Sequence, residues 1–379
     1  MKIVDVVTER FRYRTRRARD SEGHSHPGPE RDATECLLKV VTDDGAEGYC
    51  FGANAEVIQG VARPALIGED PFYREKIWQH LFHWQRSNRT MNDRVLATID
   101  LALWDLAGRA LGQPVYKLLG ASRDRVLAYA STMCGDEMPG GLSSPEDYAN
   151  FALACKARGY RALKLHTWMP PIPWAPDVRR DAACCLAVRE AVGPDMPLML
   201  DCYHGYTREE ARQLGRALER ASYYWIEEPM DEHSISSYEW LTRELDIPVV
   251  GPETAEGKGQ TRAEWIVRNA SDISRGGVFD NGGITPLMKI VGLCESHGVQ
   301  LEIHSPGAGN LHVLCAMGIK GEFYERGLLH PFLDYETPDP WLKEIVDPMD
   351  DQGYVHVSQR PGLGQDIDWD YIREHRVAR

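Results

Sequence analysis

Residues 198–253 decide the fold and read LMLDCYHGYTREEARQLGRALERASYYWIEEPMDEHSISSYEWLTRELDIPVVGPE. Three short apolar runs in this stretch end at Asp201, Glu227 and Glu253, and successive acids are 26 residues apart. One strand, the helix that follows it and the two connecting loops occupy a length of this order in parallel β/α proteins. The stretch therefore predicts consecutive strand–helix units, with three acids at the ends of neighbouring strands.

The same alternation of apolar runs and helical segments continues on both sides of this stretch. Seven or eight such units within about 200 residues favour a closed β/α barrel over an open sheet. Further strands are expected at 126–130, 162–166, near Ile273, at 299–304 and at 321–325, and helices at 145–158, 177–192, 208–221 and 284–297.

The flanking segments have a different texture. Residues 3–11 and 35–42 are expected as strands, and the Arg-, Gly- and Pro-rich residues 14–32 between them as a long surface loop. Such a loop in a compact domain is often a lid or binding loop, and is otherwise disordered. Apolar residues recur at helical spacing over 91–111, whereas residues 331–379 are polar, Pro-rich and add no barrel unit.

The composition excludes several classes of protein. The chain has 379 residues, is 43% hydrophobic and 26% charged, and has a mean hydropathy of −0.42 without a long apolar run, so disordered, fibrous and membrane-spanning classes are excluded. A net charge of −14 disfavours nucleic acid as a partner.

Nine cysteines without a C-x-x-C pair and a charged N-terminal start favour a reducing cytoplasm. We expect a cytoplasmic homo-oligomer that acts on a small-molecule carboxylate.

Charged residues end five of the expected strands. They are His166, Asp201, Glu227, Glu253 and His304. Strand ends meet in one mouth of a β/α barrel, where catalysis takes place. Three carboxylates from consecutive strands suit Mg²⁺ or Mn²⁺ better than zinc. The alternative, that each acid is a helix N-cap or a loop residue, is disfavoured by their equal spacing.

Eight short motifs occur in a fixed order along the chain. They are IDLALWDL (99–106), KLH (164–166), LDCYHGY (200–206), WIEEP (225–229), GPET (251–254), GGIT (282–285), IHS (303–305) and PGLG (361–364). Together they resemble the enolase superfamily, in its mandelate racemase-like branch, over nearly the whole chain. The resemblance implies a modified (β/α) barrel at residues 126–330. It also implies an α+β capping domain at residues 1–125, to which residues 331–379 return.

The resemblance implies a chemistry as well. One Mg²⁺ would be held by Asp201, Glu227 and Glu253, and the first step would remove the proton α to a carboxylate to give an enediolate. Such a proton is very weakly acidic, and a divalent ion stabilises the charge that develops when it leaves. The three acids are thus expected to be metal ligands.

Three residues are candidates for proton transfer. Lys164 and His166 alternate by two, so both are expected to point into the barrel, and His304 ends a strand across the mouth. The family often pairs this histidine with an Asp five residues before the Gly-Gly pair, where this chain has Gly277. That loss disfavours a two-base racemase, assigns α-proton abstraction to the Lys164/His166 side and leaves His304 as an acid. Whether Asp280 substitutes is open.

Four residues are expected to contact substrate: His24, His26, Tyr203 and Glu325. The histidines lie in the expected loop, which in this family closes over the substrate, and Glu325 ends the last strand, where a family acid contacts substrate oxygens. Solvated histidines and a strand-end salt bridge are the alternatives. Polar groups of this kind suit a polyhydroxylated substrate.

We therefore predict a magnesium-dependent dehydratase that converts an aldonate or aldarate to a 2-keto-3-deoxy acid. Epimerisation, racemisation or cycloisomerisation of a sugar lactone through the same enediolate remains an alternative. A barrel that binds sugar acids without turnover is a third hypothesis, motivated by Gly277 at the position of the family Asp.

Overall fold

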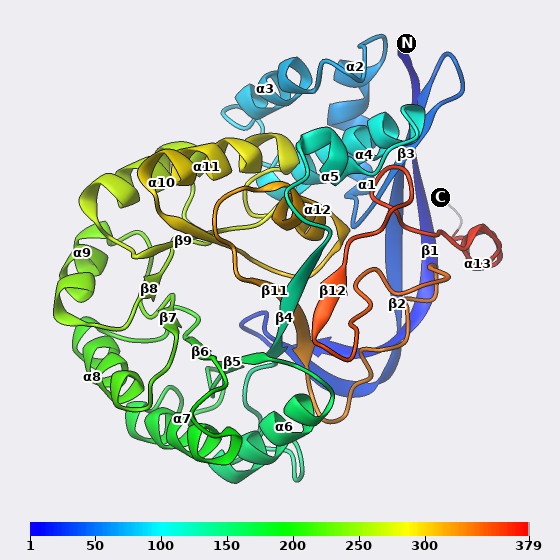
Figure 1. Cartoon of the computed structure of the whole chain (residues 1–379). Coiled ribbons are helices and arrows are strands. Elements are labelled where there is room, and N and C mark those ends of the chain that lie inside the picture. The colour runs from blue at the N-terminus through cyan, green and yellow to red at the C-terminus, as the bar shows by residue number, and fades with distance from the viewer. Residues whose placement is uncertain (378–379) are drawn as a thin grey trace.

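The computed structural model describes residues 1–377, which form a helix-covered parallel sheet and an antiparallel cap beside it (Figure 1). The predicted fold class, a modified (β/α) barrel with an α+β cap, is confirmed. No helix within residues 1–377 combines the length and apolarity that a membrane span needs.

Eight parallel strands curl into a ring with helices around it (Figure 1). Their spatial order is β10-β9-β8-β7-β6-β5-β4-β11. The strands are β4 Arg125–Thr132, β5 Ala162–His166, β6 Leu198–Asp201, β7 Trp225–Glu227, β8 Val249–Val250, β9 Ile273–Gly276, β10 Gln300–Ile303 and β11 Phe323–Leu329. The helices are α6 Pro145–Ala157, α7 Val178–Val192, α8 Arg208–Arg220, α9 Ile235–Glu244, α10 Lys258–Arg268, α11 Ile284–His297 and α12 Ala308–Ala316. The expected strands and helices are thus confirmed, with ends shifted by a few residues at most positions.

The ring is irregular at one seam. Strand β11 pairs with β4 and β10 pairs with β9, but within the described residues β10 and β11 share no ladder. Short β12 (Tyr354–His356) adds antiparallel to β4. The barrel is therefore modified rather than evenly closed.

An apolar layer fills the barrel below its mouth. Seven strands each contribute one member of this cluster: Tyr129, Ala162, Met199, Trp225, Val250, Ile273 and Phe323. Strands covered on both faces are built from near-continuous apolar runs, and all residues of β5, β6 and β7 are buried. This layer supports the charged residues at the carboxyl ends of the strands.

The cap is a three-stranded antiparallel sheet packed on helices. Its elements are β1 Ile3–Arg19, β2 Ser25–Thr42, β3 Glu47–Phe51, α1 Ala55–Val57, η1 Ile58–Ala62, α2 Arg63–Leu66, α3 Arg74–Trp84, α4 Asp93–Ala110 and α5 Val115–Leu119. Helix α4 lies so close to β3 that a Cβ on Gly48 would meet the Ala102 carbonyl oxygen at 2.2 Å. Glycine is required there because it lets the two backbones approach.

The chain end returns to the cap. After α13 (Trp369–Glu374), the amide of Arg12 donates to the carbonyl of His375, and the amide of Val377 donates to the carbonyl of Arg10. These contacts join the end of residues 331–379 to the cap, and the boundaries at 125/126 and 330/331 stay predictions.

The prediction of a long surface loop at residues 14–32 is wrong. Strands β1 and β2 continue through this segment and pair from Ile3 opposite Thr42 to Arg19 opposite Ser25, so only residues 20–24 form the turn. The segment is polar because this ribbon extends away from the core, and cross-strand charge pairs such as Arg14 with Glu30 and Asp32 line it. The outcome is a long hairpin with a short tip.

Cap and barrel meet where α4 faces the start of α11. Asp100 accepts hydrogen bonds from the amide and hydroxyl of Thr285, and the indole of Trp78 donates to the carbonyl of Gly282 at 2.7 Å. A Cβ on Gly283 would lie 2.4 Å from Oδ2 of Asp100. The Gly-Gly motif thus allows close contact between the domains.

Candidate active site

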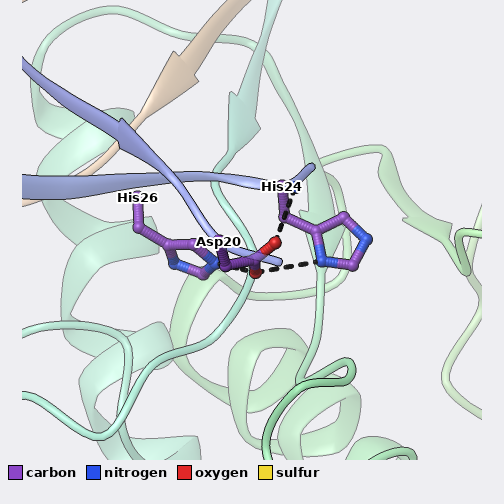
Figure 2. A group of neighbouring side chains, drawn as sticks. All are labelled: Asp20, His24 and His26. Atoms are coloured by element: carbon purple, nitrogen blue, oxygen red, sulfur yellow. Dashed lines mark hydrogen bonds and ion pairs between the residues drawn. The ribbon is translucent and has the colours of Figure 1, made fainter. Parts of the chain in front are cut away.

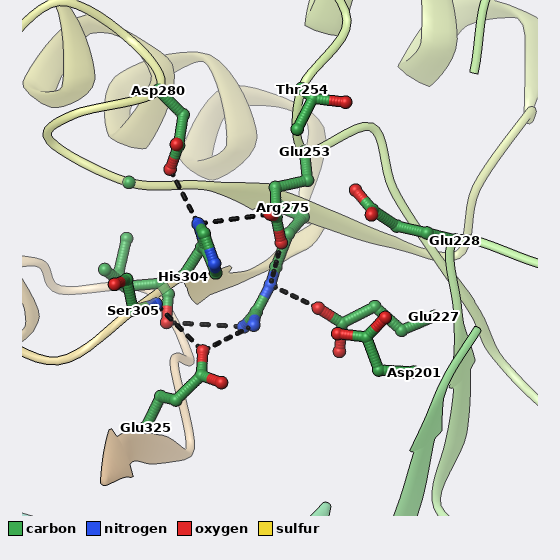
Figure 3. Close-up of polar contacts among 12 residues, drawn as sticks. Asp201, Glu227, Glu228, Glu253, Thr254, Arg275, Asp280, His304, Ser305 and Glu325 are labelled. Carbon is green, nitrogen blue, oxygen red and sulfur yellow. Dashed lines mark hydrogen bonds and ion pairs between the residues drawn. The ribbon is translucent and has the colours of Figure 1, made fainter. Parts of the chain in front are cut away.

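The three predicted metal ligands lie at the barrel mouth (Figure 3). Asp201 and Glu227 are the last residues of β6 and β7, and Glu253 follows the end of β8 by three residues. All three side chains are buried. Parallel register places Asp201 directly beside Glu227, as the spacing of the apolar runs predicts.

Lys164 and His166 both point into this mouth, as their alternation on β5 predicts. Nζ of Lys164 lies 3.0 Å from Oδ2 of Asp201 and 3.2 Å from Oε1 of Glu227. Nε2 of His166 lies 3.0 Å from Oδ2 of Asp201, and its Nδ1 lies 2.6 Å from the carbonyl oxygen of Thr132. Contacts with the neighbouring strands β4 and β6 thus fix both nitrogens of the imidazole ring.

The donor chemistry of this site fits a hard divalent cation. Burial raises the pKa of Glu253, which His304 and Arg275 only partly oppose. Burial and the neighbouring carboxylates of Glu253 and Glu232 raise the pKa of Glu228 well above its usual range, and its buried Oε1 has no hydrogen-bond partner within residues 1–377. Carboxylates are thus gathered in excess of cations, an arrangement that a divalent ion would stabilise.

The carboxylate oxygens of Asp201, Glu227 and Glu253 do not converge on one point in the structure. Among the described residues, the groups of three ligand atoms that lie within 4.8 Å of one another are Asp20, His24 and His26, and His204, Glu228 and Glu232. Lys164 and Arg275 instead contact the predicted ligands. Binding of one ion by Asp201, Glu227 and Glu253 would therefore exchange the Lys164 contacts of Asp201 and Glu227 for contacts to the ion.

Glu232 and Arg262 hold the turn that carries Glu253. The Glu232 carboxylate accepts hydrogen bonds from the backbone amides of Glu253, Thr254 and Ala255. The buried Arg262 donates to the carbonyl of Glu253 at 2.6 Å. Neither residue was predicted, because their roles depend on contacts between loops that are distant from a strand end.

His304 has a carboxylate partner after all. Its Nδ1 lies 2.8 Å from Oδ2 of Asp280 and 3.2 Å from Oε1 of Glu253 (Figure 3). Burial would lower the pKa of His304, but Glu253 and Asp280 outweigh burial and raise it to about 10. The sequence leaves open whether Asp280 substitutes for the missing Asp, and in the structure Asp280 contacts His304 from the turn after β9.

Glu325 is surrounded by donors. Ser131 Oγ donates to it at 2.7 Å and the amide of Ser305 at 2.8 Å, and Nζ of Lys164 lies 3.1 Å away. Burial would raise its pKa, but Lys164 and Arg275 hold it well below its usual range. A contact between Glu325 and substrate stays a prediction.

Arg275 on β9 was not identified from the sequence. Its guanidinium lies among Glu227, Glu253 and Glu325, in the centre of Figure 3. An arginine within a short buried run was the available signal, since a fully buried arginine must be paired.

The hairpin tip reaches the mouth. Asp20 Oδ2 lies 2.9 Å from Nε2 of His26 and 3.3 Å from Nδ1 of His24, and Asp20 Oδ1 accepts the amide of His24 (Figure 2). The His24 ring is 4.7 Å from the ring of Tyr203, which is 5.0 Å from that of His166. The structure therefore brings the rings of His24 and Tyr203 to His166, while His26 orders the tip through Asp20.

Comparisons with known proteins agree with this architecture. Residues 28–120 match the mandelate racemase/muconate lactonizing enzyme N-terminal domain, and residues 147–371 match the enolase C-terminal domain-like family. The chain is 31% identical to D-galactarolactone cycloisomerase of Agrobacterium fabrum over 90% of this chain and 91% of that protein. It is 31% identical to L-talarate/galactarate dehydratase of Salmonella typhimurium, over 89% and 82% respectively.

A solved structure is more similar still. The crystal structure of D-glucarate dehydratase from Agrobacterium tumefaciens complexed with magnesium is 55% identical, covers 100% of both chains and superposes with a TM-score of 0.98. The two domain matches together span most of the described chain. This chain therefore belongs to the mandelate racemase/muconate lactonizing enzyme family of the enolase superfamily.

Proposed function

We propose that this chain is a magnesium-dependent hydro-lyase that converts a sugar acid to a 2-keto-3-deoxy acid through an enediolate. The observation that carries the proposal is the placement of His166 and His304 beside one set of strand-end carboxylates, with His166 contacting Asp201 and His304 contacting Glu253. Dehydration needs one group that takes the α proton and one that protonates the departing 3-hydroxyl. The two histidines supply such a pair.

The proposed substrate is an aldarate of the D-glucarate type. Support comes from the 55% identity to D-glucarate dehydratase and from the relative that acts on talarate and galactarate. Tyr203 and His24 would contact the substrate on the side of His166, and Glu325 would contact it from β11. The chain's acidity does not oppose an anionic substrate, since a few cations can reverse the field locally.

The protein's own groups can perform the proton transfers. Asp201, Glu227 and Glu253 would hold Mg²⁺, which when bound stabilises negative charge on the substrate carboxylate. His166 would receive the α proton at Nε2, and Lys164 would place a positive charge beside the same face. His304, oriented through Nδ1 by Asp280, would donate a proton from Nε2 to the leaving hydroxyl.

A second candidate is cycloisomerisation of a sugar lactone. It is favoured by the 31% identity to D-galactarolactone cycloisomerase and by the His304–Asp280 pair, which can act as a base as well as an acid. Both reactions begin with removal of an α proton, so the mouth described here would serve either.

A product assay tests the proposal. The purified enzyme with Mg²⁺ is incubated with a library of aldonates, aldarates and aldarolactones, and 2-keto acid is measured. Formation of a 2-keto-3-deoxy acid from glucarate supports dehydration. Consumption of a lactone without a 2-keto acid would favour the second candidate, and no turnover of any compound would contradict both.

The proposed setting is a reducing cytoplasm. All nine cysteines are free and buried in the described structure, and burial raises the pKa of several of their thiols. Unreactive thiols of this kind serve as small apolar core residues. The expected homo-oligomer stays a prediction, and light scattering of the purified protein would test it.

A further inference from the structure

Arg275 occupies the centre of the barrel mouth (Figure 3). Its side chain is fully buried and extends from β9 toward strands on both sides. Nε lies 2.7 Å from Oε1 of Glu227 and 3.4 Å from Oε2 of Glu253, and Nη2 lies 2.8 Å from Oε2 of Glu325. One guanidinium thus contacts carboxylates from β7, from the turn after β8 and from β11.

The remaining donors of Arg275 are also engaged. Nη1 donates to the carbonyl of Ile303 at 3.3 Å, and Nη2 donates to the hydroxyl of Tyr129 at 3.1 Å. Arginine has five N–H groups, and these contacts use four of them. The orientation of the guanidinium plane is therefore fixed, and only one N–H donor is left that could bind a substrate.

We infer that Arg275 is a positioning residue, which fixes the orientation of Glu227, Glu253 and Glu325 and so sets the affinity of the site for Mg²⁺. The inference rests on the proposed metal role of Glu227 and Glu253. A planar guanidinium can hold several carboxylates at fixed angles, whereas a lysine ammonium is a flexible point charge. Shape as well as charge is thus required at this position.

Arg275 can affect Mg²⁺ affinity by orienting the carboxylates or by its positive charge, and the two effects have opposite signs. A positive charge beside a cation site repels the cation, so its removal alone would tighten Mg²⁺ binding. Loss of orientation would weaken binding, because Glu227 and Glu253 would no longer be held by the shared Nε of Arg275 and would have to be ordered when the ion binds. Arg275→Lys keeps the charge and removes the planar fork, whereas Arg275→Gln removes both the fork and the charge. The difference between the two variants therefore isolates the effect of the charge.

Arg326 provides a matched control. It is also fully buried, lies next to Glu325 on β11, and pairs with Glu336 and Tyr160 rather than with residues of the mouth. Arg326→Lys should therefore cost stability as Arg275→Lys does, without changing the metal site.

The experiment measures the dissociation constant of Mg²⁺ by titration calorimetry on full-length, chelator-treated protein. We expect Arg275→Lys to weaken Mg²⁺ binding at least tenfold, and Arg326→Lys to change it less than twofold. At saturating Mg²⁺, kcat of Arg275→Lys should partly recover, whereas KM for the sugar acid should stay raised, because Glu325 is released as well. Circular dichroism and a melting curve establish that each variant is folded.

Three results would overturn the inference. They are an Mg²⁺ affinity of Arg275→Lys within twofold of the wild type, tighter binding by Arg275→Gln with Arg275→Lys unchanged, and equal weakening by Arg326→Lys. Should Arg275→Lys not fold, Tyr129→Phe removes one of the two contacts of Nη2, the other being Glu325, and a smaller weakening of Mg²⁺ binding is expected. An affinity unchanged from the wild type would likewise contradict the inference.

The readout also separates this inference from the proposed function. Normal Mg²⁺ binding by the wild type without any 2-keto acid product would contradict the proposed reaction and leave the Arg275 result interpretable. A wild type that does not bind Mg²⁺ would overturn both.

Discussion

The carboxylate of Asp280 occupies the space that a side chain at residue 277 would need. A Cβ on Gly277 would lie 2.6 Å from Oδ2 of Asp280 and 2.7 Å from the carbonyl oxygen of His304. Gly277 lacks the carboxylate that the family has at this position. It also leaves space for the carboxylate of Asp280, three residues farther along the chain. The histidine–carboxylate pair is kept while its second member has moved.

Asp280→Asn should lower kcat by about 100-fold, because an amide holds His304 without stabilising its charged form. Mg²⁺ affinity should change much less. Steady-state kinetics and metal titration measure the two effects, and Asn281→Ala is unsuitable as a control since Asn281 accepts from the amide of Gly277. Asp195→Asn, an exposed change in the turn between α7 and β6, serves instead. Unchanged kcat in Asp280→Asn would contradict the role of the pair.

Relocation of the carboxylate can be tested directly. Gly277→Asp alone should lose activity, since its side chain would collide with Asp280. Combined with Asp280→Gly, which removes the carboxylate but not the 2.7 Å approach to the His304 carbonyl oxygen, it should recover only part of the lost kcat. A double variant no better than the worse single variant would show that the two positions are not interchangeable.

His304→Asn should block dehydration yet still allow the α proton to exchange with solvent deuterium, because α-proton removal is assigned to the His166 side. His166→Ala should stop both exchange and dehydration, unless Lys164 is the base. Proton NMR of substrate recovered from deuterium oxide measures the exchange. Exchange that persists in His166→Ala and vanishes in His304→Asn would reverse the two assignments.

Glu253→Gln should abolish activity while the fold survives, because one of three negatively charged ligands is lost. Excess chelator should inactivate the wild type, and Mg²⁺ should restore it. Glu256→Gln is the matched control, since Glu256 lies three residues on and is exposed. Full activity in excess chelator would contradict a metal-dependent reaction.

Asp100 gives the cap–barrel contact a pH dependence. Burial raises its pKa to about 6, with the hydrogen bonds from Thr285 opposing this shift. The unfolded value is near 4, so between these values the folded state binds more protons, and stability falls as the pH rises. From pH 5 to pH 7 the wild type should lose about 1 kcal/mol relative to Asp100→Asn. Melting temperatures of the two proteins at pH 5, 6 and 7 measure this, and a constant difference would contradict it.

The hairpin tip should control substrate affinity. His24→Ala removes the ring that contacts Tyr203, and KM for the sugar acid should rise about tenfold, with a smaller change in kcat. His26→Gln should have a weaker effect through Asp20. His297→Ala, an exposed histidine at the C-terminal end of α11, is the control. Equal KM values for His24→Ala and the control would contradict a role of the hairpin tip in substrate binding.

The sequence alone determined the barrel and the identity of its strand-end residues. Apolar runs and acids at a fixed interval reflect the length of a repeating β/α unit, a local property that the order of residues carries directly. The alternation of Lys164 and His166 likewise follows from strand geometry. Each of these residues lies where the pattern placed it, with Glu253 just beyond its strand.

Only the tertiary structure decided how the groups of the mouth pair with one another. The Asp280–His304 contact, the position of Arg275 among three carboxylates and the support of Glu253 by Glu232 join residues from different loops and strands. The long hairpin was not predicted from the sequence for the same reason, since its polar strands are held by cross-strand pairing rather than by an apolar face. Local patterns record which face of an element is buried, whereas the partner of a buried charge depends on which elements the fold brings together.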